Sequence, residues 1–460
     1  MQHTGLTYHL ADTIAALSTP PGTSATALIR VSGAQALHLV QSIFVSRKKL
    51  HTQPSHTAHY GKIQEGKHVL DEVVVTLFKA PRSFTKEDVV EISCHGSPYI
   101  VRAILQLLVR QGARVAEPGE FTYRAFVHGR YDLTQAEAVA NLIEAQSQAA
   151  HQLALAQMRG SISKKLQGLR AQLIRLTALV ELELDFAEED VAFASRQELT
   201  QLVVTLRQEV AALLESFALG NALQQGIATV LVGKPNAGKS TLFNALLEAP
   251  KALVTDLPGT TRDVLEDTIT IDGIQFRFID TAGLREAQDP IEAMGIAKGK
   301  ARRKEAQLVV HLFDLTQESL SSIQATLDTL SQDKTPYVAV GNKIDQADTK
   351  LQQACSALGL VLIAAKEKTH LDTLKKRLVG HVSQPAAGGG VMLVNARHYE
   401  ALQKSHQALQ HVLAGLEQAR SNDLLAQDLR DALHHIGLLT GEVHTEDLLH
   451  HIFAHFCIGK

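Results

Sequence analysis

The sequence predicts a multidomain protein of the α/β plus α class, with an α/β domain inserted between two helical segments. With 460 residues, the chain exceeds one ordinary hydrophobic core, and roughly 150 residues per domain suggests about three domains. Strand-like runs and turn residues fill residues 1–126, and helical periodicity follows. At Gly226 the pattern changes to a continuous apolar run that ends in glycine, as in a buried parallel strand.

Residues 1–126 are expected to form a compact α+β domain. Apolar runs at 27–31 and 73–78 have the length and composition of strands. Proline and glycine at residues 20–22 mark a turn between such runs. This mixture of strands and turn residues differs from the helical pattern of the residues that follow.

Two helical segments, residues 127–222 and 384–460, flank the inserted domain. Their apolar side chains recur at spacings of three and four, which places them on one face of a helix. The two segments can therefore pack as one central helical bundle. The first segment carries Ile162, Leu166, Leu169, Leu173, Leu176 and Val180, and the second carries Leu402, Leu409, Val412, Leu416, Leu425, Leu429, Leu433 and Ile436.

The inserted domain, residues 223–383, is predicted to alternate strands with helices. Residues 227–232 form its first buried strand, and the pair Asp272 and Gly273 predicts the turn of a hairpin. Further apolar runs that are typical of parallel strands occur at residues 308–313, 337–340 and 360–363.

Composition limits the possible functions. The chain has 45 Lys and Arg against 48 Asp and Glu, a net charge of -3, so no global basic field holds nucleic acid. Any RNA contact needs a local patch or a partner. No apolar run approaches the roughly 20 residues of a membrane span, and the N-terminus lacks a signal-peptide pattern. The separated Cys94, Cys355 and Cys457 favour no disulfide framework, so we expect a cytoplasmic protein.

Residues 233–240 match the phosphate-binding loop and lie between a predicted strand and a predicted helix. Glycines in this motif let backbone amides curl around phosphates. Lys239 supplies a point charge, and the Ser240 hydroxyl is a magnesium ligand.

Two further motifs follow predicted strands in the same domain. In residues 280–283, Asp280 is placed to reach magnesium through water, and the Gly283 amide to meet a γ-phosphate. The third motif comprises Asn342, Lys343 and Asp345, whose carboxylate can accept two hydrogen bonds from guanine. Adenine cannot satisfy that arrangement, so the sequence predicts a Ras-like G domain that binds GTP.

Residues 255–263 are polar, contain a glycine and lie where a first switch loop is expected. Thr261 is the natural second magnesium ligand, although a plain surface loop is the alternative. Leu284 follows the second motif, and an aliphatic side chain cannot orient an attacking water. Catalysis must therefore be arranged differently from that of many small GTPases.

Further motifs lie outside the inserted domain, and the most specific is the terminal run 456–460. Together with the nucleotide motifs, they make the chain resemble the tRNA modification GTPase family MnmE, also called TrmE, over essentially its whole length. The other segments that carry the resemblance are residues 19–22, 30–33, 83–85, 87–88, 95–96, 118–121, 124–126, 132–133, 135–138, 447–449 and 452–453.

The resemblance implies an N-terminal domain that binds a reduced folate, formyl- or methylene-tetrahydrofolate, and forms a homodimer. It also implies a heterotetramer with the flavoprotein MnmG. This complex would modify the C5 position of the wobble uridine of tRNA. Folate would be the one-carbon donor. GTP hydrolysis in this family requires potassium and contact between two G domains.

The same resemblance assigns residues to the potassium ion and to catalysis. Asn236 and the loop residues Thr255, Leu257 and Thr260 match the ion's ligands, so the cation would take the place of an arginine finger. Glu292 matches the glutamate that positions water, although an ordinary solvated glutamate at a helix start is the alternative.

For folate, the family pattern points to Arg30, Glu91, Arg130 and Lys460. A carboxylate suits the pterin edge, and cations suit the glutamate tail. Arg130 replaces the family's usual lysine, which keeps the charge but changes the geometry.

A second departure concerns Ala364, Ala365 and Lys366, where the guanine-contacting loop of the family normally opens with serine. The hydroxyl is lost, and a backbone amide is expected to suffice for the contact. Cys457 is a candidate nucleophile or one-carbon handle, and a small packed residue is the alternative. The catalytic set is Glu292, Asp280, Lys239 and Cys457. The GTP set is Asn236, Ala237, Gly238, Lys239, Ser240, Thr241, Thr255, Asp256, Leu257, Pro258, Gly259, Thr260, Thr261, Asp280, Thr281, Ala282, Gly283, Asn342, Lys343, Asp345, Ala364, Ala365 and Lys366.

Two other functions share these nucleotide motifs. A ribosome-assembly GTPase would need an RNA-binding module or a second G domain, and the sequence contains one phosphate loop. A GTP-gated scaffold would leave every bond change to MnmG, and equal modification by a Cys457→Ser protein would favour it. The basic run at 298–304 is interpreted as a solvated helix face, with contact to tRNA or MnmG as the less favoured alternative.

Overall fold

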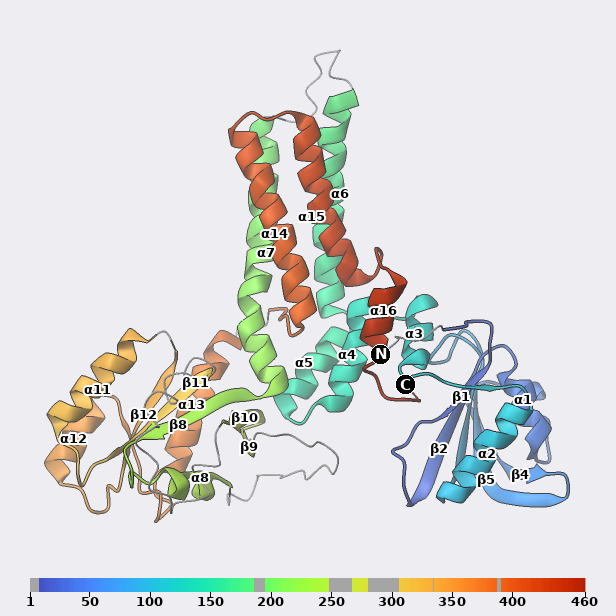
Figure 1. Ribbon diagram of the computed structural model, residues 1–460, viewed down its shortest axis with the longest axis horizontal. Coiled ribbons are helices and arrows are strands. Elements are labelled where there is room, and N and C mark those ends of the chain that lie inside the picture. Colours follow the sequence, from blue (N-terminus) through green and yellow to red (C-terminus); the bar gives the residue numbers. More distant parts are fainter. Residues whose placement is uncertain are drawn as a thin grey trace, which may run out of the picture. The chain divides into compact units, whose positions relative to one another are not determined.

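The computed structural model describes residues 8–185, 195–247, 267–279, 306–333, 335–386 and 390–459 (Figure 1). They divide into two compact units. The first unit draws on residues 1–140, 157–199 and 407–460, and the second on residues 141–156 and 200–406. Together they show the multidomain α/β plus α class that the sequence predicts.

A seven-stranded sheet forms the N-terminal part of the first unit, in the order β3-β4-β5-β6-β2-β1-β7. All neighbours pair antiparallel except β1 and β7, which pair parallel. The predicted runs at 27–31 and 73–78 lie in β2 and β5, as expected. The strands are β1 (Ile14–Leu17), β2 (Ser24–Ser32), β3 (Phe44–Val45), β4 (Thr57–Glu65), β5 (His68–Phe78), β6 (Val89–Gly96) and β7 (Arg114–Val115).

Short helices cover this sheet and complete its core. In α2 (Pro98–Arg110), proline occupies the first turn, where its missing amide hydrogen costs no hydrogen bond. Its buried Val101, Ile104, Leu107 and Leu108 recur every three or four residues and join the core of the sheet. The other elements are α1 (Ala36–Ile43), the 3-10 helix η1 (Leu50–Thr52), α3 (Glu120–Val127) and α4 (Leu133–Glu144).

Long helices complete the first unit. The stripe predicted from Ile162 to Val180 lies on α6 (Ser161–Asp185), and all six of its side chains are buried. This helix packs along α15 (Asn422–Thr440), which ends at Gly441 in a left-handed conformation (φ 82°). The last helix is α16 (Glu446–Phe453).

A six-stranded sheet forms the second unit, in the order β13-β12-β11-β8-β10-β9, and only β9 and β10 pair antiparallel. Asp272 and Gly273, at φ 47° and 80°, make the predicted hairpin turn. Edge strand β13 covers two of the four predicted residues. The strands are β8 (Ile227–Gly233), β9 (Asp267–Ile271), β10 (Ile274–Phe278), β11 (Leu308–Asp314), β12 (Tyr337–Asn342) and β13 (Val361–Leu362).

Helices surround this parallel sheet, as the alternating pattern predicts. They are α5 (Gln148–Met158), α8 (Lys239–Leu247), α11 (Leu320–Gln332), α12 (Thr349–Ala357) and α13 (Leu371–Ala386). Most of α7 (Arg196–Gln225) and the first half of α14 (Ala396–Glu417) also belong here, and Phe217 stacks on Tyr399 at 4.7 Å. In the part of the chain that the structure describes, no helix is long and apolar enough to cross a membrane.

Candidate functional site

The phosphate-binding motif forms a tight loop between the end of β8 and the start of α8. Asn236 and Gly238 adopt left-handed conformations, at φ 61° and 96°. A Cβ atom at Gly238 would lie 2.3 Å from Nδ2 of Asn342, so only glycine fits there. The loop therefore closes against another motif of the same domain.

Two lysines of this loop have different partners. Lys239 Nζ donates hydrogen bonds to the carbonyl oxygens of Gly233 (2.9 Å) and Lys234 (3.1 Å), which holds its charge against the loop. Lys234 Nζ instead pairs with Glu318 Oε2 at 2.8 Å. Only Lys239 is thus positioned to neutralise a phosphate bound by the loop.

Asn342, which is buried, connects the loops of the nucleotide site. Its Nδ2 donates to the Ala237 carbonyl oxygen at 2.8 Å, and its Oδ1 accepts from the Ala365 amide at 2.9 Å. The Ala364 amide donates to the carbonyl oxygen of Thr369. Both alanine amides therefore have hydrogen-bond acceptors within the protein.

Lys343 is fixed by a carboxylate that the sequence did not reveal as a site residue. Its Nζ lies 2.6 Å from Oδ2 of Asp314, at the end of β11. Burial opposes ionisation of Asp314, but hydrogen bonds from Lys343 and Thr316 outweigh it and lower the pKa of its carboxyl group. The sequence feature that could have identified Asp314 is its position as an acidic residue at the carboxyl end of a parallel strand. Asp345 and Lys366 are exposed.

Several predicted site residues lie outside the described residues. They are Thr255, Asp256, Leu257, Pro258, Gly259, Thr260, Thr261, Asp280, Thr281, Ala282, Gly283, Leu284, Glu292, Lys460 and the basic run 298–304.

In the N-terminal domain, Arg30 and Glu91 face each other across β2 and β6. Arg30 donates from Nε (3.0 Å) and Nη2 (2.8 Å), both to Oε1 of Glu91. Arg30 Nη1 also donates to the carbonyl oxygen of Gly459 at 3.2 Å, and Ser18 Oγ donates to the same oxygen at 3.1 Å. Gly459 is therefore anchored beside the two predicted folate ligands.

Glu91 and Arg130 line one cavity of about 500 Å³. The guanidinium of Arg130 lies 5.5 Å from the centre of the Phe84 ring, and that of Arg30 lies at the same distance from this ring. Arg130 also donates to the carbonyl oxygen of Ser83. The structure thus brings Arg30, Glu91 and Arg130 together around Phe84, which the sequence marked as part of a motif without giving it a role.

A buried ionic network supports the loop that carries Phe84. Arg124, fully buried, pairs with Glu87 at 3.1 Å and with Glu120 at 3.1 Å. Glu87 also accepts from Ser32 Oγ at 2.7 Å. Buried charges persist only when they are paired in this way, so these motif residues hold the cavity's wall in place.

The cysteines differ in exposure. Cys94 and Cys355 are buried, and burial, helped by the charge of Asp71, raises the pKa of the Cys94 thiol to about 11. Cys457 is exposed, and its carbonyl oxygen accepts from the Gly119 amide at 3.4 Å. A thiol must be accessible to act as a nucleophile, and Cys457 meets that condition.

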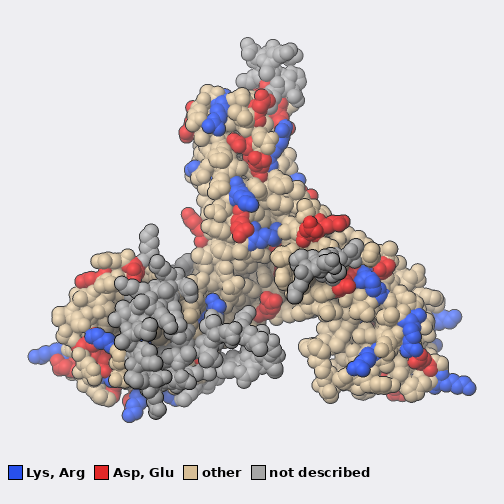
Figure 2. Space-filling view, in the orientation of Figure 1, with Lys and Arg blue, Asp and Glu red and all other residues tan. Residues whose placement is uncertain are grey.

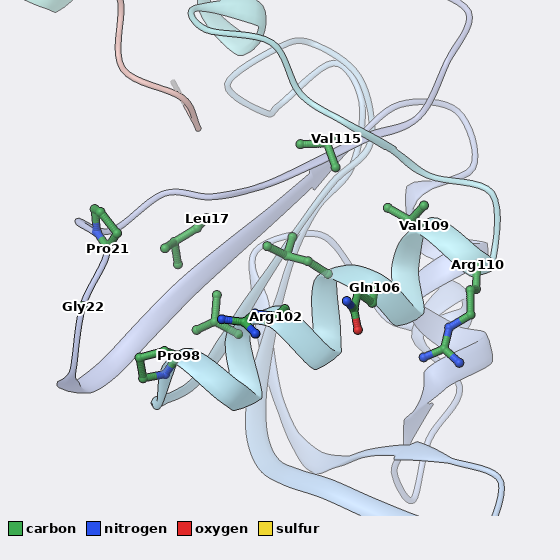
Figure 3. A pocket seen from close by; sticks show the side chains of 11 residues that line it. Leu17, Pro21, Gly22, Pro98, Arg102, Gln106, Val109, Arg110 and Val115 are labelled. Carbon is green, nitrogen blue, oxygen red and sulfur yellow. The ribbon is translucent and has the colours of Figure 1, made fainter.

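Another cavity of about 580 Å³ lies beside α2 and holds none of the predicted site residues. Leu17, Pro21 and Val115 form one side of it, and Gln106 and Val109 of α2 form the other (Figure 3). Its lining is largely apolar.

Family models match most of the chain. The model for the MnmE helical domain matches residues 133–457, and the model for the GTP-binding protein TrmE N-terminus matches residues 13–130.

Curated relatives match the chain over its length. The tRNA modification GTPase MnmE of Cytophaga hutchinsonii is 49% identical over 100% of both chains. Those of Christiangramia forsetii and Flavobacterium psychrophilum are 46% and 44% identical, each over 98% of this chain and 100% of the relative. The chain therefore belongs to the MnmE family of tRNA modification GTPases.

Proposed function

We propose that this chain is a potassium-activated GTPase that works with the flavoprotein MnmG. Together they modify the C5 position of the wobble uridine of tRNA, to aminomethyl or carboxymethylaminomethyl forms, with a one-carbon unit from a reduced folate. The observation that carries the proposal is the linkage, through Asn342, of the phosphate loop to the loop at Ala365. The cavity beside Arg30 and Glu91 supports the folate part.

In this proposal, GTP lies with its phosphates on the loop of residues 233–240. Lys239 offsets the phosphate charge, and the start of α8 directs backbone amides toward it. Ser240 and Thr261 would hold magnesium, which offsets charge that develops on the phosphate oxygens. Glu292 would position the attacking water, and Asp280 would support the magnesium ion.

Asn236 is the proposed side-chain ligand of potassium. Among the described residues its exposed amide has no hydrogen-bond partner, so its oxygen can take an ion. Backbone oxygens of Thr255, Leu257 and Thr260 would complete the site, and the ion would supply the charge of an arginine finger. Equal GTP turnover in sodium and potassium at matched ionic strength would reject this assignment.

The folate site is proposed at the cavity of Glu91 and Arg130. Nε and Nη2 of Arg30 both donate to Oε1 of Glu91, which leaves Oε2 to accept from a pterin edge. A volume of about 500 Å³ lies within the usual range for small-molecule sites. Arg130 and Lys460 would pair with the glutamate tail, and Cys457 would act as the nucleophile or one-carbon handle.

Homodimerisation through the N-terminal domain and a complex with MnmG complete the proposal. Both would act in the cytoplasm.

The decisive experiment is mass spectrometry of tRNA nucleosides from a strain that lacks this protein. Complementation with wild type should restore C5-aminomethyl-type uridines, and an Asp280→Ala variant should not restore them. An unchanged nucleoside profile in the deletion strain, in the absence of a paralogue, would reject the proposed pathway and return the role to ribosome assembly.

A further inference from the structure

A groove lies on the second unit beside β13, the edge strand of its sheet. Its volume is about 930 Å³, and α12, β13 and α13 form its walls. An adjoining hollow of about 520 Å³ shares Gly359, Arg377 and His381 with it and reaches Tyr337, the first residue of β12. None of the predicted nucleotide-site residues lines this groove.

Basic side chains dominate the helix that forms one wall of the groove. Helix α13 carries Lys375, Lys376 and Arg377 against one acidic residue, Asp372, in a chain whose net charge is -3. Lys376 and Arg377 line the groove, are exposed and form no ion pair within the described residues. Lys375, in contrast, pairs with Asp372 at 3.6 Å. Basic and acidic side chains are interspersed over the visible face of the molecule (Figure 2).

Hydrogen-bond donors and open space accompany these charges. The Ser356 and Thr373 hydroxyls line the groove, as does His370, whose Nδ1 bonds to the carbonyl oxygen of Leu362 at 3.2 Å. A Cβ atom at Gly359 or Gly380 would meet nothing within 4 Å, so a ligand can approach the backbone there. The groove thus has hydrogen-bond donors and glycines along its floor and cations on one wall. This arrangement suits an extended polymer with repeated negative charges better than a compact molecule.

We propose that this groove, the α13 groove, binds the phosphodiester backbone of RNA. It is defined by Ser356, Gly359, His370, Thr373, Lys376 and Arg377. Unpaired Lys and Arg side chains bind phosphates and release counterions, which supplies most non-specific RNA affinity. An acidic protein partner fits less well, because protein interfaces depend on aromatic or aliphatic anchors. The aliphatic residues of this groove, Leu360, Val361 and Leu362, are buried or half-buried, whereas Lys376 and Arg377 are exposed. The identity of the RNA as tRNA rests on the proposed function.

The test measures binding of labelled bulk bacterial tRNA to the full-length protein by fluorescence anisotropy, from 50 to 200 mM KCl. The Lys376→Gln/Arg377→Gln variant should bind about tenfold more weakly at the low end of this range. The slope of log affinity against log salt should fall by about 2, one for each phosphate that the variant no longer neutralises. GTP turnover without RNA should stay at the wild-type rate.

A matched control removes one Arg and one Lys from an exposed loop of the first unit, as Arg47→Gln/Lys48→Gln. It should keep the wild-type affinity and slope. Equal affinity of the groove variant and wild type overturns the inference, as does the absence of tRNA binding by wild type. An equal decrease in the control variant also overturns it, because the effect then reflects net charge alone.

The nucleoside profile separates this inference from the proposed function. If wild type restores modified uridines and the groove variant binds tRNA like wild type, the inference fails and the function stands. If wild type does not affect the uridines, the proposed function fails whatever the groove binds. A groove variant that keeps its tRNA affinity but no longer binds an acidic protein partner would assign the surface to that partner and overturn the inference.

Discussion

The candidate nucleotide site uses loops that follow strands β8, β12 and β13, whereas the N-terminal cavity is lined by side chains from strands and loops. In the first, backbone conformation dominates, as at Asn236 and Gly238. In the second, the two guanidinium groups of Arg30 and Arg130 lie near one ring, Phe84. Backbone amides and one cation are enough to bind a phosphate group, whereas a pocket for a small organic ligand needs several specific side chains.

The two sites should therefore respond differently to substitution. In the phosphate loop, a few residues that are close in sequence make most of the contacts to the nucleotide. Single substitutions there should therefore greatly reduce GTP binding or hydrolysis. The cavity distributes its contacts, so single changes should be milder and should leave GTP turnover intact.

Lys239→Gln should lower the rate of GTP hydrolysis by roughly 100-fold or more, because it removes a charge aimed at the phosphates. Lys234→Gln is the matched control from the same loop, since Lys234 pairs with Glu318 instead. It should lower the rate by no more than about threefold. Phosphate release under saturating GTP measures both, and equal decreases would contradict the different roles of the two lysines.

Asn342→Ala should weaken GDP binding by about 10- to 100-fold. It removes the bonds to Ala237 and Ala365, and a buried group left without its partner costs about 1 to 3 kcal/mol. A fluorescent GDP analogue measures the affinity. Asn395→Ala removes only a local bond to the Arg397 amide and should leave the affinity unchanged. Wild-type affinity in Asn342→Ala would show that the link between the loops is dispensable.

Glu91→Gln should weaken binding of 5-formyltetrahydrofolate by about tenfold, because a charge-assisted hydrogen bond becomes a neutral one. GTP turnover should not change. Glu65→Gln is the control, since Glu65 pairs with Arg110 on the surface of the same domain. Equilibrium dialysis measures the affinity, and unchanged binding by Glu91→Gln would remove this cavity as the folate site.

The smallest effect concerns pH. Because the pKa of Asp314 is lowered in the folded protein, its ionised form contributes stability that is complete above the unfolded value of 3.8 and disappears as pH falls through the folded pKa. Asp314→Asn should therefore lower Tm by roughly 3 to 6 °C at pH 7. The difference from wild type should narrow below about pH 4.

Thermal unfolding at pH 7, 5 and 3.5 measures this difference. The exposed Asp333 provides the control variant, Asp333→Asn, which should match wild type throughout. A difference in Tm that stays constant down to pH 3.5 would contradict the role given to the Asp314 carboxylate.

Much of the fold could be predicted from sequence because its signals are local. The stripe from Ile162 to Val180 and the hairpin turn at Asp272 and Gly273 each depend on neighbouring residues, and both are confirmed. The shorter extent of β13 could not be predicted, because its length depends on pairing with β12 alone. The proposed domain boundaries remain predictions.

The phosphate loop follows from the amino-acid sequence without further information, since a strand, a glycine-rich turn and a helix succeed one another within residues 227–247. Tertiary folding was needed to bring Arg30 to Glu91, 61 residues away, and to the carbonyl of Gly459, 429 residues away. It also revealed Asp314 as the anchor of Lys343. Such contacts depend on strand register and on the path of the chain between distant elements, and no local periodicity in the sequence predicts them.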